Sequence, residues 1–584
     1  MKTGSEAYCA KTAAYVGLLI DICYFGLLVH CQLKPAIRVR LNRGIFEQAS
    51  SIVAGLVEYE VPRIQIPNSQ QCFTEGCVQI HSFRMTSFRL PRSISFQPSP
   101  PNQFALRVTD FDFFVTGQLS GTIQVLLQIP VAGSVYVSGR GISVTAYLDL
   151  QKTFGDEPYL RFLSCELDHG FVDTRVENMG IFTDTVNSKY RGTMSDQSRS
   201  QLEQAICANM NRLAQQHFST RLTRLPNQIS AKELVELLIT ENEALTKTNS
   251  TTLLKRNRRA ASDDYYDDLE SSPSSSSSKR TTPTPKQISF STQNTEEPGS
   301  FKINRSDVKN FFNVERLSHI MIDLTLLDAY STMTEFTVGM DGAVTTTKTP
   351  GSPPFDPPFP FRLPEAEQIR QAEIVISNYT LNSLLYQAHR TNSLLFHVDS
   401  KTPGVGGTLK TTCSLDEVCI SDQIEEVGQK YPDRSFELIV RTTKAPTVRI
   451  EKDNLYLELS GRCLFFLEGT RQKVGVIPFD SLARIQMQTE NSLVKGQMKI
   501  LRLTFENSVD FFGLTASDLD GFRATIQTAL ENLMNKFMMR GISLNTKSLK
   551  VPLKFSSAHM SLERDVIILQ ANVDLFNSLY ANQG

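Results

Sequence analysis

A proline- and phenylalanine-rich stretch, Ser352–Pro364 (SPPFDPPFPFRLP), places the strongest constraint on how this chain can fold. Proline fixes its own φ, donates no backbone hydrogen bond and holds the preceding residue extended, so no helix or central strand can run through the stretch. Its phenylalanines are too apolar for a solvated linker, which is typically Gly/Ser-rich or charged. We therefore expect a stiff, extended crossing between two bodies, with an ordinary surface loop as the alternative.

Length and composition limit the class of protein. A chain of 584 residues is long enough for several domains or for two large ones. Its 40% hydrophobic residues supply ample core. The formal net charge of −1 provides no general attraction to nucleic acid. We therefore expect no nucleic-acid partner.

Residues 1–31 are typical of a secretory signal peptide. Lys2 and Lys11 precede an apolar run, 13–29, which is interrupted only by Asp21. The alternative is a retained membrane anchor. A span needs about 20 apolar residues, however, and a charge at its centre costs roughly 2.5 kcal/mol or more. We expect the remainder of the chain to be secreted and extracellular.

An extracellular chain can form disulfides, so its cysteines are candidates for pairing. Cys72 and Cys77 are close in sequence, as are Cys413 and Cys419, so each pair could close a small loop. Cys165 and Cys207 could tie distant segments together. An odd cysteine is then left over. No CxxC motif or His–Cys cluster occurs, and we predict no metal site. The seven cysteines after residue 31 are Cys72, Cys77, Cys165, Cys207, Cys413, Cys419 and Cys463.

Residues 38–234 follow the order helix, strands, helix. Helical spacing relates Ile45, Ala49, Ile52 and Leu56, and Pro62 ends that helix. A second helix is predicted over 195–218, with Ser195 as its N-cap. Two alternating runs between these helices are typical of strands with one buried face. The apolar stripe of the second helix consists of Leu202, Ile206, Met210 and Leu213; the strand runs are Leu119, Ile123, Val125, Leu127 and Ile129, and then Ile142, Val144, Ala146, Leu148 and Leu150.

The insert at 240–300 has the composition of a segment that cannot bury enough surface to fold. Its RNRR run ends at Arg259 and is a candidate proprotein-cleavage site, while Tyr265 and Tyr266 lie among acidic residues and are candidates for sulfation. An unprocessed charged linker is the alternative. Sequons for N-glycosylation occur at Asn249, Asn304 and Asn378.

The second half repeats the plan of the first. Residues 321–347 and 372–376 alternate like strands, and a helix is predicted over 380–389. More strands follow, in which Leu455, Leu457 and Leu459 alternate, as do Leu501, Leu503 and Phe505. A long amphipathic helix then carries Leu519, Phe522, Ile526, Leu530, Leu533 and Phe537 on one face. Two halves with the same element order indicate a pseudo-duplicated molecule.

This element order, the SPPFDPPFP centre, the positions of Cys165 and Cys207, and the ending HMSLERDVIILQANVDLF resemble the bactericidal/permeability-increasing protein family. That family includes lipopolysaccharide-binding protein and the phospholipid and cholesteryl ester transfer proteins. The resemblance covers nearly all of 38–576 but neither the signal peptide nor the insert. It implies an α+β fold in which two tubular domains, each a long helix wrapped by a highly twisted antiparallel sheet, are joined by a central sheet into a boomerang.

The resemblance also implies a domain plan: a signal peptide (1–31), an N-terminal lipid-binding tube (32–239), the insert (240–300), a central sheet with the Pro-rich crossing (301–364) and a C-terminal tube (365–584). The family's disulfide falls on Cys165 and Cys207. The brace between the tubes would be formed by Phe355, Phe359 and Phe361. The expected lipid-pocket residues are Ile52, Leu56, Leu202, Ile206 and Met210 in the first tube, and Phe522, Ile526, Leu530 and Leu533 in the second.

We therefore expect a secreted protein that carries or transfers phospholipids or other acyl lipids, contacts membrane or lipoprotein surfaces transiently, and needs no cofactor. An innate-immune binder of lipopolysaccharide is the alternative. Residues 34 and 38–234 carry only 20 basic against 17 acidic side chains, a weaker excess than bactericidal members have. Arg84, Arg89 and Arg92, interleaved with aromatic residues, could form a basic-aromatic tip for headgroups. A lipase would need GxSxG, which is absent, so we predict no enzyme.

Overall fold

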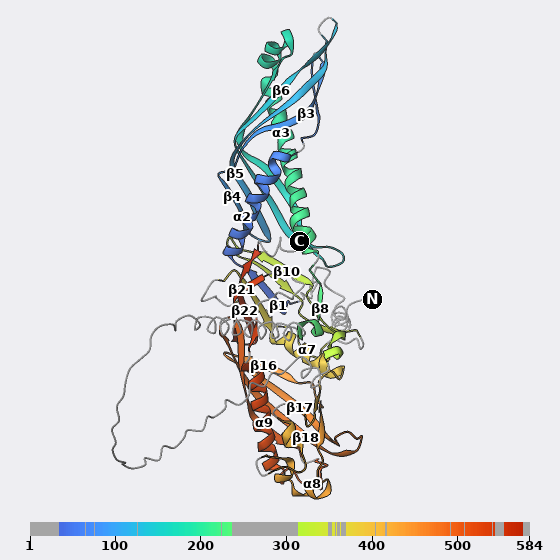
Figure 1. Ribbon diagram of the computed structural model, residues 1–584. Coiled ribbons are helices and arrows are strands. Elements are labelled where there is room, and N and C mark those ends of the chain that lie inside the picture. Colours follow the sequence, from blue (N-terminus) through green and yellow to red (C-terminus); the bar gives the residue numbers. More distant parts are fainter. Residues whose placement is uncertain are drawn as a thin grey trace, which may run out of the picture.

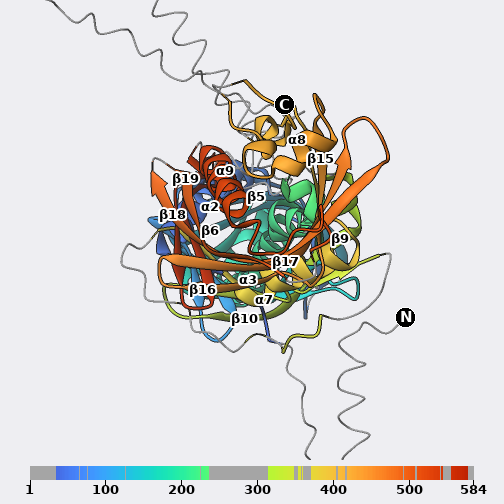
Figure 2. The same cartoon turned by 90° about the horizontal axis from the view of Figure 1, so that it is seen from below.

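The computed structural model describes residues 34–235, 314–347 and 353–575, apart from gaps at 65, 75, 125–126, 224, 357, 359–362, 364–369, 403–404, 415–416, 491, 507–508, 540 and 544–553. The molecule is elongated, with a body of curled sheet and helix at each end and a set of shorter strands between them (Figure 1). In the view along the long axis, strands curve around the helices (Figure 2). This architecture confirms the predicted fold class.

The first body is one antiparallel sheet with two main helices, α2 (Arg43–Glu60) and α3 (Thr183–Ala214). Strand order is β2-β3-β5-β6-β7, and β4 pairs with β5. Short helical turns flank the main helices: η1 (Val61–Arg63), η2 (Gly180–Phe182), the π-helical η3 (Gln215–Ser219) and α4 (Thr220–Leu222). The strands are β2 (Ser69–Phe73), β3 (Gly76–Arg89), β4 (Ser93–Ser99), β5 (Gln103–Gln124), β6 (Gln128–Lys152) and β7 (Pro158–Glu177).

One of the two predicted strand runs in this body is wrong. The run 119–129 is a hairpin: β5 ends at Gln124, β6 begins at Gln128, and Ile123 pairs with Ile129. Leu127 consequently lies near the turn, where its side chain is 77% exposed. The prediction failed because residues 122–130 contain none of the Gly, Asn or Asp residues that usually signal a turn. In the other run, from Ile142 to Leu150, the predicted apolar side chains are buried along β6 as far as Leu148, and Leu150 is half-buried.

A six-stranded antiparallel sheet lies between the two bodies, in the order β10-β11-β1-β13-β22-β21. It is wider than the predicted segment 301–364, because strands from both ends of the chain enter it. A smaller sheet, β12-β9-β8, lies alongside. The strands are β1 (Ile37–Leu41), β8 (Gln228–Ser230), β9 (Ile320–Asp323), β10 (Leu326–Ser331), β11 (Phe336–Met340), β12 (Val344–Thr346), β13 (Ala372–Ser377), β21 (Lys554–Glu563) and β22 (Val566–Asp574); the turn η4 (Val314–His319) precedes β9.

The second body contains a seven-stranded sheet, β14-β15-β17-β18-β19-β20 with β16 beside β17. Its helices are α7 (Asn378–Arg390), α8 (Glu425–Lys430) and α9 (Asp520–Met539), with the turns η5 (Gly406–Leu409) and η6 (Ile420–Asp422). The strands are β14 (Leu395–Val398), β15 (Phe436–Thr442), β16 (Thr447–Glu451), β17 (Asn454–Leu467), β18 (Lys473–Glu490), β19 (Leu493–Phe505) and β20 (Ile542–Ser543).

The prediction that Leu501 faces the core of this sheet is wrong, because a β-bulge lies at this residue. Leu501 is 44% exposed, although Leu503 in the same strand is buried. The register of β19 against β18 shifts between Leu482 and Ala483, so the alternation of inward and outward side chains changes phase at Leu501. Sequence alternation alone does not reveal such an extra residue.

The helix α3 starts at Thr183, twelve residues before the predicted Ser195. Its first half has no clear apolar stripe because its polar side chains bond to the backbone of β7, the edge strand of the sheet. Ser195 is therefore a helix-interior residue rather than an N-cap. The bonds join Asn187 to the N–H and C=O of Val176 (2.9 and 2.8 Å), Ser195 to the N–H of Thr174 (3.0 Å), and Arg199 to the carbonyls of Gly170 (2.7 Å) and Leu167 (3.0 Å).

The helix α9 covers β19 in the same way. The amide of Asn535 bonds to both the N–H and the C=O of Met498, at 2.6 and 2.9 Å, as Asn187 does with Val176. Gln527 and Glu531, eight and four residues earlier, bond to the backbone of Ile500. An exposed strand edge is a site for unwanted pairing, and these side chains block it. The shared device supports a pseudo-duplication of the two bodies.

Only part of the Pro-rich crossing lies within the described residues. Pro353 and Pro358 are buried, and the ring of Phe355 packs edge-on against Tyr386 of α7 with 5.8 Å between ring centroids. Phe359 and Phe361 lie outside the described residues, so the predicted brace stays a prediction for them. Among the helices that the structure describes, none combines the length and the hydropathy needed to cross a membrane.

Candidate functional site

An apolar pocket lies in the first body, between α2, α3 and the sheet. Its empty space, counted out to the open side, is about 1220 Å³. Of the 27 residues that line it, 24 are apolar. A polar group in such a space would lose its hydrogen bonds to water, which is unfavourable. Transfer of an acyl chain from water into this space is favourable. The lining is therefore suited to hydrocarbon.

Four of the five predicted first-tube residues line this pocket: Leu56 from α2, and Leu202, Ile206 and Met210 from α3. Their side chains are half-buried and belong to two helices on the same side of the sheet. Ile52 is 7% exposed and is buried in the core, but it is not among the lining residues.

The prediction missed the strand side of the pocket. Val108, Phe111 and Phe113 of β5, with Val144 and Leu148 of β6, form much of its floor. Strand alternation correctly marked the β6 residues as inward-facing. It could not show that they face an empty space, because a buried face looks the same in sequence whether protein or a ligand covers it.

The three polar lining residues gather at one place, where the C-terminal ends of α2 and α3 approach each other. Glu60 Oε2 lies 3.5 Å from Arg212 Nη2, and this same nitrogen donates to Asn209 Oδ1 at 3.3 Å. The side chains of Glu60 and Arg212 are 24% and 46% exposed, so they stand at the pocket's rim. Nearby, burial and the charge of Arg221 lower the pKa of His217 below its usual value.

The disulfide Cys165–Cys207 joins β7 to α3, one residue from the pocket residue Ile206. The structure also joins Cys72 to Cys77 across the β2–β3 hairpin and Cys413 to Cys419 in a short loop of the second body. Cys463 carries a free thiol and packs between two apolar clusters. Burial raises the pKa of Cys463 to about 12, which makes it a poor nucleophile at neutral pH.

The predicted second-tube residues pack against other side chains of the second body. Phe522 is 4% exposed and lies 6.2 Å, ring to ring, from Phe465. Ile526 and Leu533 join the same cluster, and Leu530 packs in a neighbouring one. A second lipid site at these residues stays a prediction.

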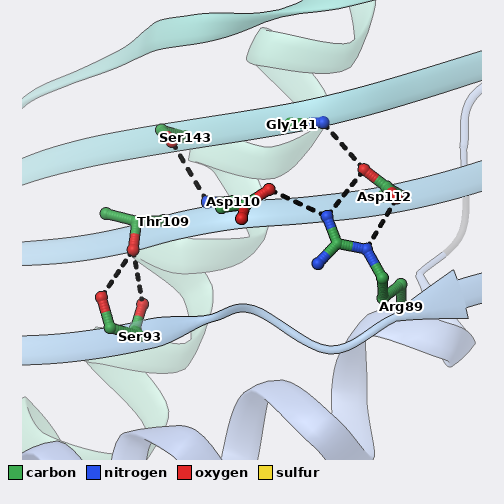
Figure 3. Close-up of polar contacts among 7 residues, drawn as sticks. All are labelled: Arg89, Ser93, Thr109, Asp110, Asp112, Gly141 and Ser143. Atoms are coloured by element: carbon green, nitrogen blue, oxygen red, sulfur yellow. Dashed lines mark hydrogen bonds and ion pairs between the residues drawn. The ribbon is translucent and has the colours of Figure 1, made fainter.

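The predicted basic-aromatic tip is not supported at Arg89, whose side chain binds acidic residues of the same sheet, and it stays a prediction for Arg84 and Arg92. The Arg89 guanidinium bonds to both oxygens of Asp112, at 2.7 and 3.0 Å, and to Asp110 at 2.8 Å (Figure 3). Asp112 also accepts a bond from the N–H of Gly141. Register shifts in β5 and β6 lie at this point. Arg89 therefore holds bulged strands together, and its aromatic neighbour Phe88 lines the pocket.

This network predicts a small acid dependence of stability. The bonds from Arg89 and Gly141 lower the pKa of Asp112 from its ordinary 3.8 to about 2. Because the folded-state pKa is below the unfolded one, the stabilisation is complete above about pH 4 and disappears as the pH falls through about 2. We expect Asp112→Asn to cost at most about 1 kcal/mol at pH 7, since the pair is partly exposed. Urea denaturation should show that this difference vanishes near pH 2.

The predicted modification sites are mostly outside the described residues. Asn249, Asn304, Arg259, Tyr265 and Tyr266 all lie there. Asn378 is described: it begins α7, and its Nδ2, the atom to which a glycan would attach, donates to Asp565 Oδ1 at 2.9 Å. Glycosylation at Asn378 would therefore alter an existing contact, and it stays a prediction.

Comparison with known proteins gives one family match, in the second half of the chain. Residues 315–575 match the model of the LBP / BPI / CETP family, C-terminal domain. A search of the curated proteins found no match. Among solved structures, the chain is similar to a lipopolysaccharide binding protein, with 16% identity, a TM-score of 0.43, and coverage of 93% of this chain and 99% of that one.

Two further solved structures are more distant. Takeout 1 of Epiphyas postvittana shares 12% identity at a TM-score of 0.22, over 30% of this chain and 90% of that one. P47 of Clostridium botulinum E1 shares 9% identity at a TM-score of 0.27, over 93% of this chain and all of that one. The family model agrees with the resemblance over residues 315–575. Residues 315–575 of this chain therefore resemble the C-terminal domain of the LBP / BPI / CETP family.

Proposed function

We propose that this protein is a secreted lipid carrier that holds the acyl chains of phospholipids or related lipids in the pocket of its first body. The observation that carries the proposal is the lining, which is apolar at 24 of 27 positions and polar only at one rim. Burial of each methylene in such a site is worth about 0.8 kcal/mol. A lipid with long acyl chains therefore binds without any catalytic group.

The chemistry of the lining supports carriage over catalysis. The lining residues include no serine, cysteine or histidine that could act as a nucleophile or general base. The match of residues 315–575 to a family whose members bind or transfer lipids supports the same function. Lipopolysaccharide, whose lipid portion also carries acyl chains, is the competing ligand, and transient contact with a membrane or lipoprotein surface would load or unload the pocket.

Filling the pocket should abolish binding. We expect Ile206→Trp to reduce binding of a fluorescent acyl-labelled phospholipid at least tenfold, because the indole would occupy space that the acyl chain needs. The matched control is Ile181→Trp, since Ile181 is 87% exposed and lies outside the pocket. Thermal unfolding of both variants checks that each is folded.

Native mass spectrometry of the secreted protein tests the proposal directly, since it identifies whatever co-purifies. We expect a lipid with acyl chains, lost in Ile206→Trp. Competition with lipopolysaccharide then shows which ligand is preferred. If neither phospholipid nor lipopolysaccharide co-purifies or can be loaded, the carrier proposal is wrong.

A further inference from the structure

The pocket's polar residues are confined to one end. Glu60 closes the last turn of α2, and Asn209 and Arg212 lie in the last two turns of α3. The remaining 24 lining residues offer no hydrogen-bonding side chain. A ligand that fits this lining has one polar end and is otherwise apolar. A lipid without a charged headgroup would offer no charged group to Glu60 or Arg212.

The ion pair at the rim is loosely made. The distance of 3.5 Å between Glu60 Oε2 and Arg212 Nη2 exceeds the 2.7–2.9 Å that is usual for a charge-assisted hydrogen bond. Elsewhere in the same body, Arg191 holds Asp173 through two bonds of 2.8 and 2.7 Å. Arg212 instead spreads its donors over Glu60, Asn209 and, at 3.0 Å, Gln216.

The local backbone adds to the argument. Gln216 lies in the π-helical turn η3, which directly follows α3, and the same turn supplies the lining residue Phe218. Such π-helical turns inside helices are frequent at functional sites. This turn directly follows the last turn of α3, which carries Arg212.

We propose that the Glu60–Arg212 pair reads the headgroup of the bound lipid: Arg212 binds its phosphate and Glu60 binds its ammonium group. The inference rests on the proposed carrier function. One cation and one anion, adjacent, partly exposed and loosely paired, are complementary to a zwitterionic headgroup such as phosphocholine, which presents both charges on one short chain. An anionic headgroup meets Arg212 favourably but is repelled by Glu60.

Charge removal at each rim residue tests this assignment. Full-length secreted protein is assayed with fluorescent acyl-labelled phosphatidylcholine, phosphatidylglycerol and diacylglycerol. We expect Glu60→Gln to weaken phosphatidylcholine binding about tenfold and to leave phosphatidylglycerol unchanged or stronger, because the variant removes the carboxylate charge that attracts the quaternary ammonium group. We expect Arg212→Gln to weaken both phospholipids, and neither variant to change diacylglycerol binding.

The matched controls are Arg43→Gln and Glu47→Gln, which break an exposed ion pair on the same helix α2 but away from the pocket. These two should bind all three lipids as the unaltered protein does. Equal loss of all three lipids in Glu60→Gln, or retained phosphatidylcholine binding in both rim variants, would overturn the headgroup assignment. Failure of the unaltered protein to bind any of the three lipids would instead overturn the carrier function on which it rests.

Discussion

Replacing Glu373 with Gln should lower the free energy of unfolding by about 3–5 kcal/mol, the cost of leaving one charge of a buried ion pair without its partner. Glu373 is 1% exposed and Arg40 is 8% exposed. The Arg40 guanidinium donates from Nε to Glu373 Oε2 at 2.7 Å and also from Nη2. The two residues face each other directly in the pairing of β1 with β13. The pair thus ties β1, the first strand in the described part of the chain, into the sheet between the two bodies.

Chemical denaturation, followed by circular dichroism, measures this effect. Glu47→Gln is the control, because it breaks an ion pair whose side chains are 77% and 63% exposed, and it should change stability by less than about 0.5 kcal/mol. The double variant Arg40→Met with Glu373→Leu should regain most of the loss, since an apolar pair can replace a buried ion pair. A Glu373→Gln midpoint equal to that of Glu47→Gln would show that the buried pair does not hold the central sheet.

Removing the disulfide between β7 and α3 should have a similarly large effect. Its cysteines are 42 residues apart in sequence, and a loop of this length corresponds to roughly 4 kcal/mol in the chain-entropy account. We expect Cys165→Ala with Cys207→Ala to lose about this much stability. Lipid retention should fall as well, because the bond anchors the helix that carries Leu202, Ile206 and Met210 to the pocket.

The matched comparison is Cys72→Ala with Cys77→Ala, which opens a loop of only 5 residues and should cost about half as much. That hairpin disulfide contributes no lining residue to the pocket, so lipid retention should be unchanged. Equal lipid retention in both double variants would contradict the anchoring role of Cys165–Cys207. The readouts are the denaturation midpoint and the lipid that co-purifies.

Parts of the fold and of the site could be predicted from local patterns. Leu202, Ile206 and Met210 recur at helical spacing and do line the pocket, and the alternation from Ile142 to Leu148 does mark the inner face of β6. The start of α3 could not be predicted this way. Polar side chains in its first half, such as Asn187, form hydrogen bonds with the backbone N–H and C=O groups of the edge strand β7. Such contacts leave no apolar periodicity in the sequence.

By itself, the sequence determined the two-body α+β plan, the candidate disulfide cysteines and the absence of a GxSxG motif, because periodicity, spacing and residue type are local properties. Only the tertiary structure decided that the α3 stripe faces an open pocket while the similar α9 stripe, with Phe522, packs against Phe465. It also brought Glu60 and Arg212 together across 152 positions. Hydrophobic periodicity indicates which side chains are shielded from water. Whether those side chains pack against protein or face a pocket depends on how elements distant in sequence pack together.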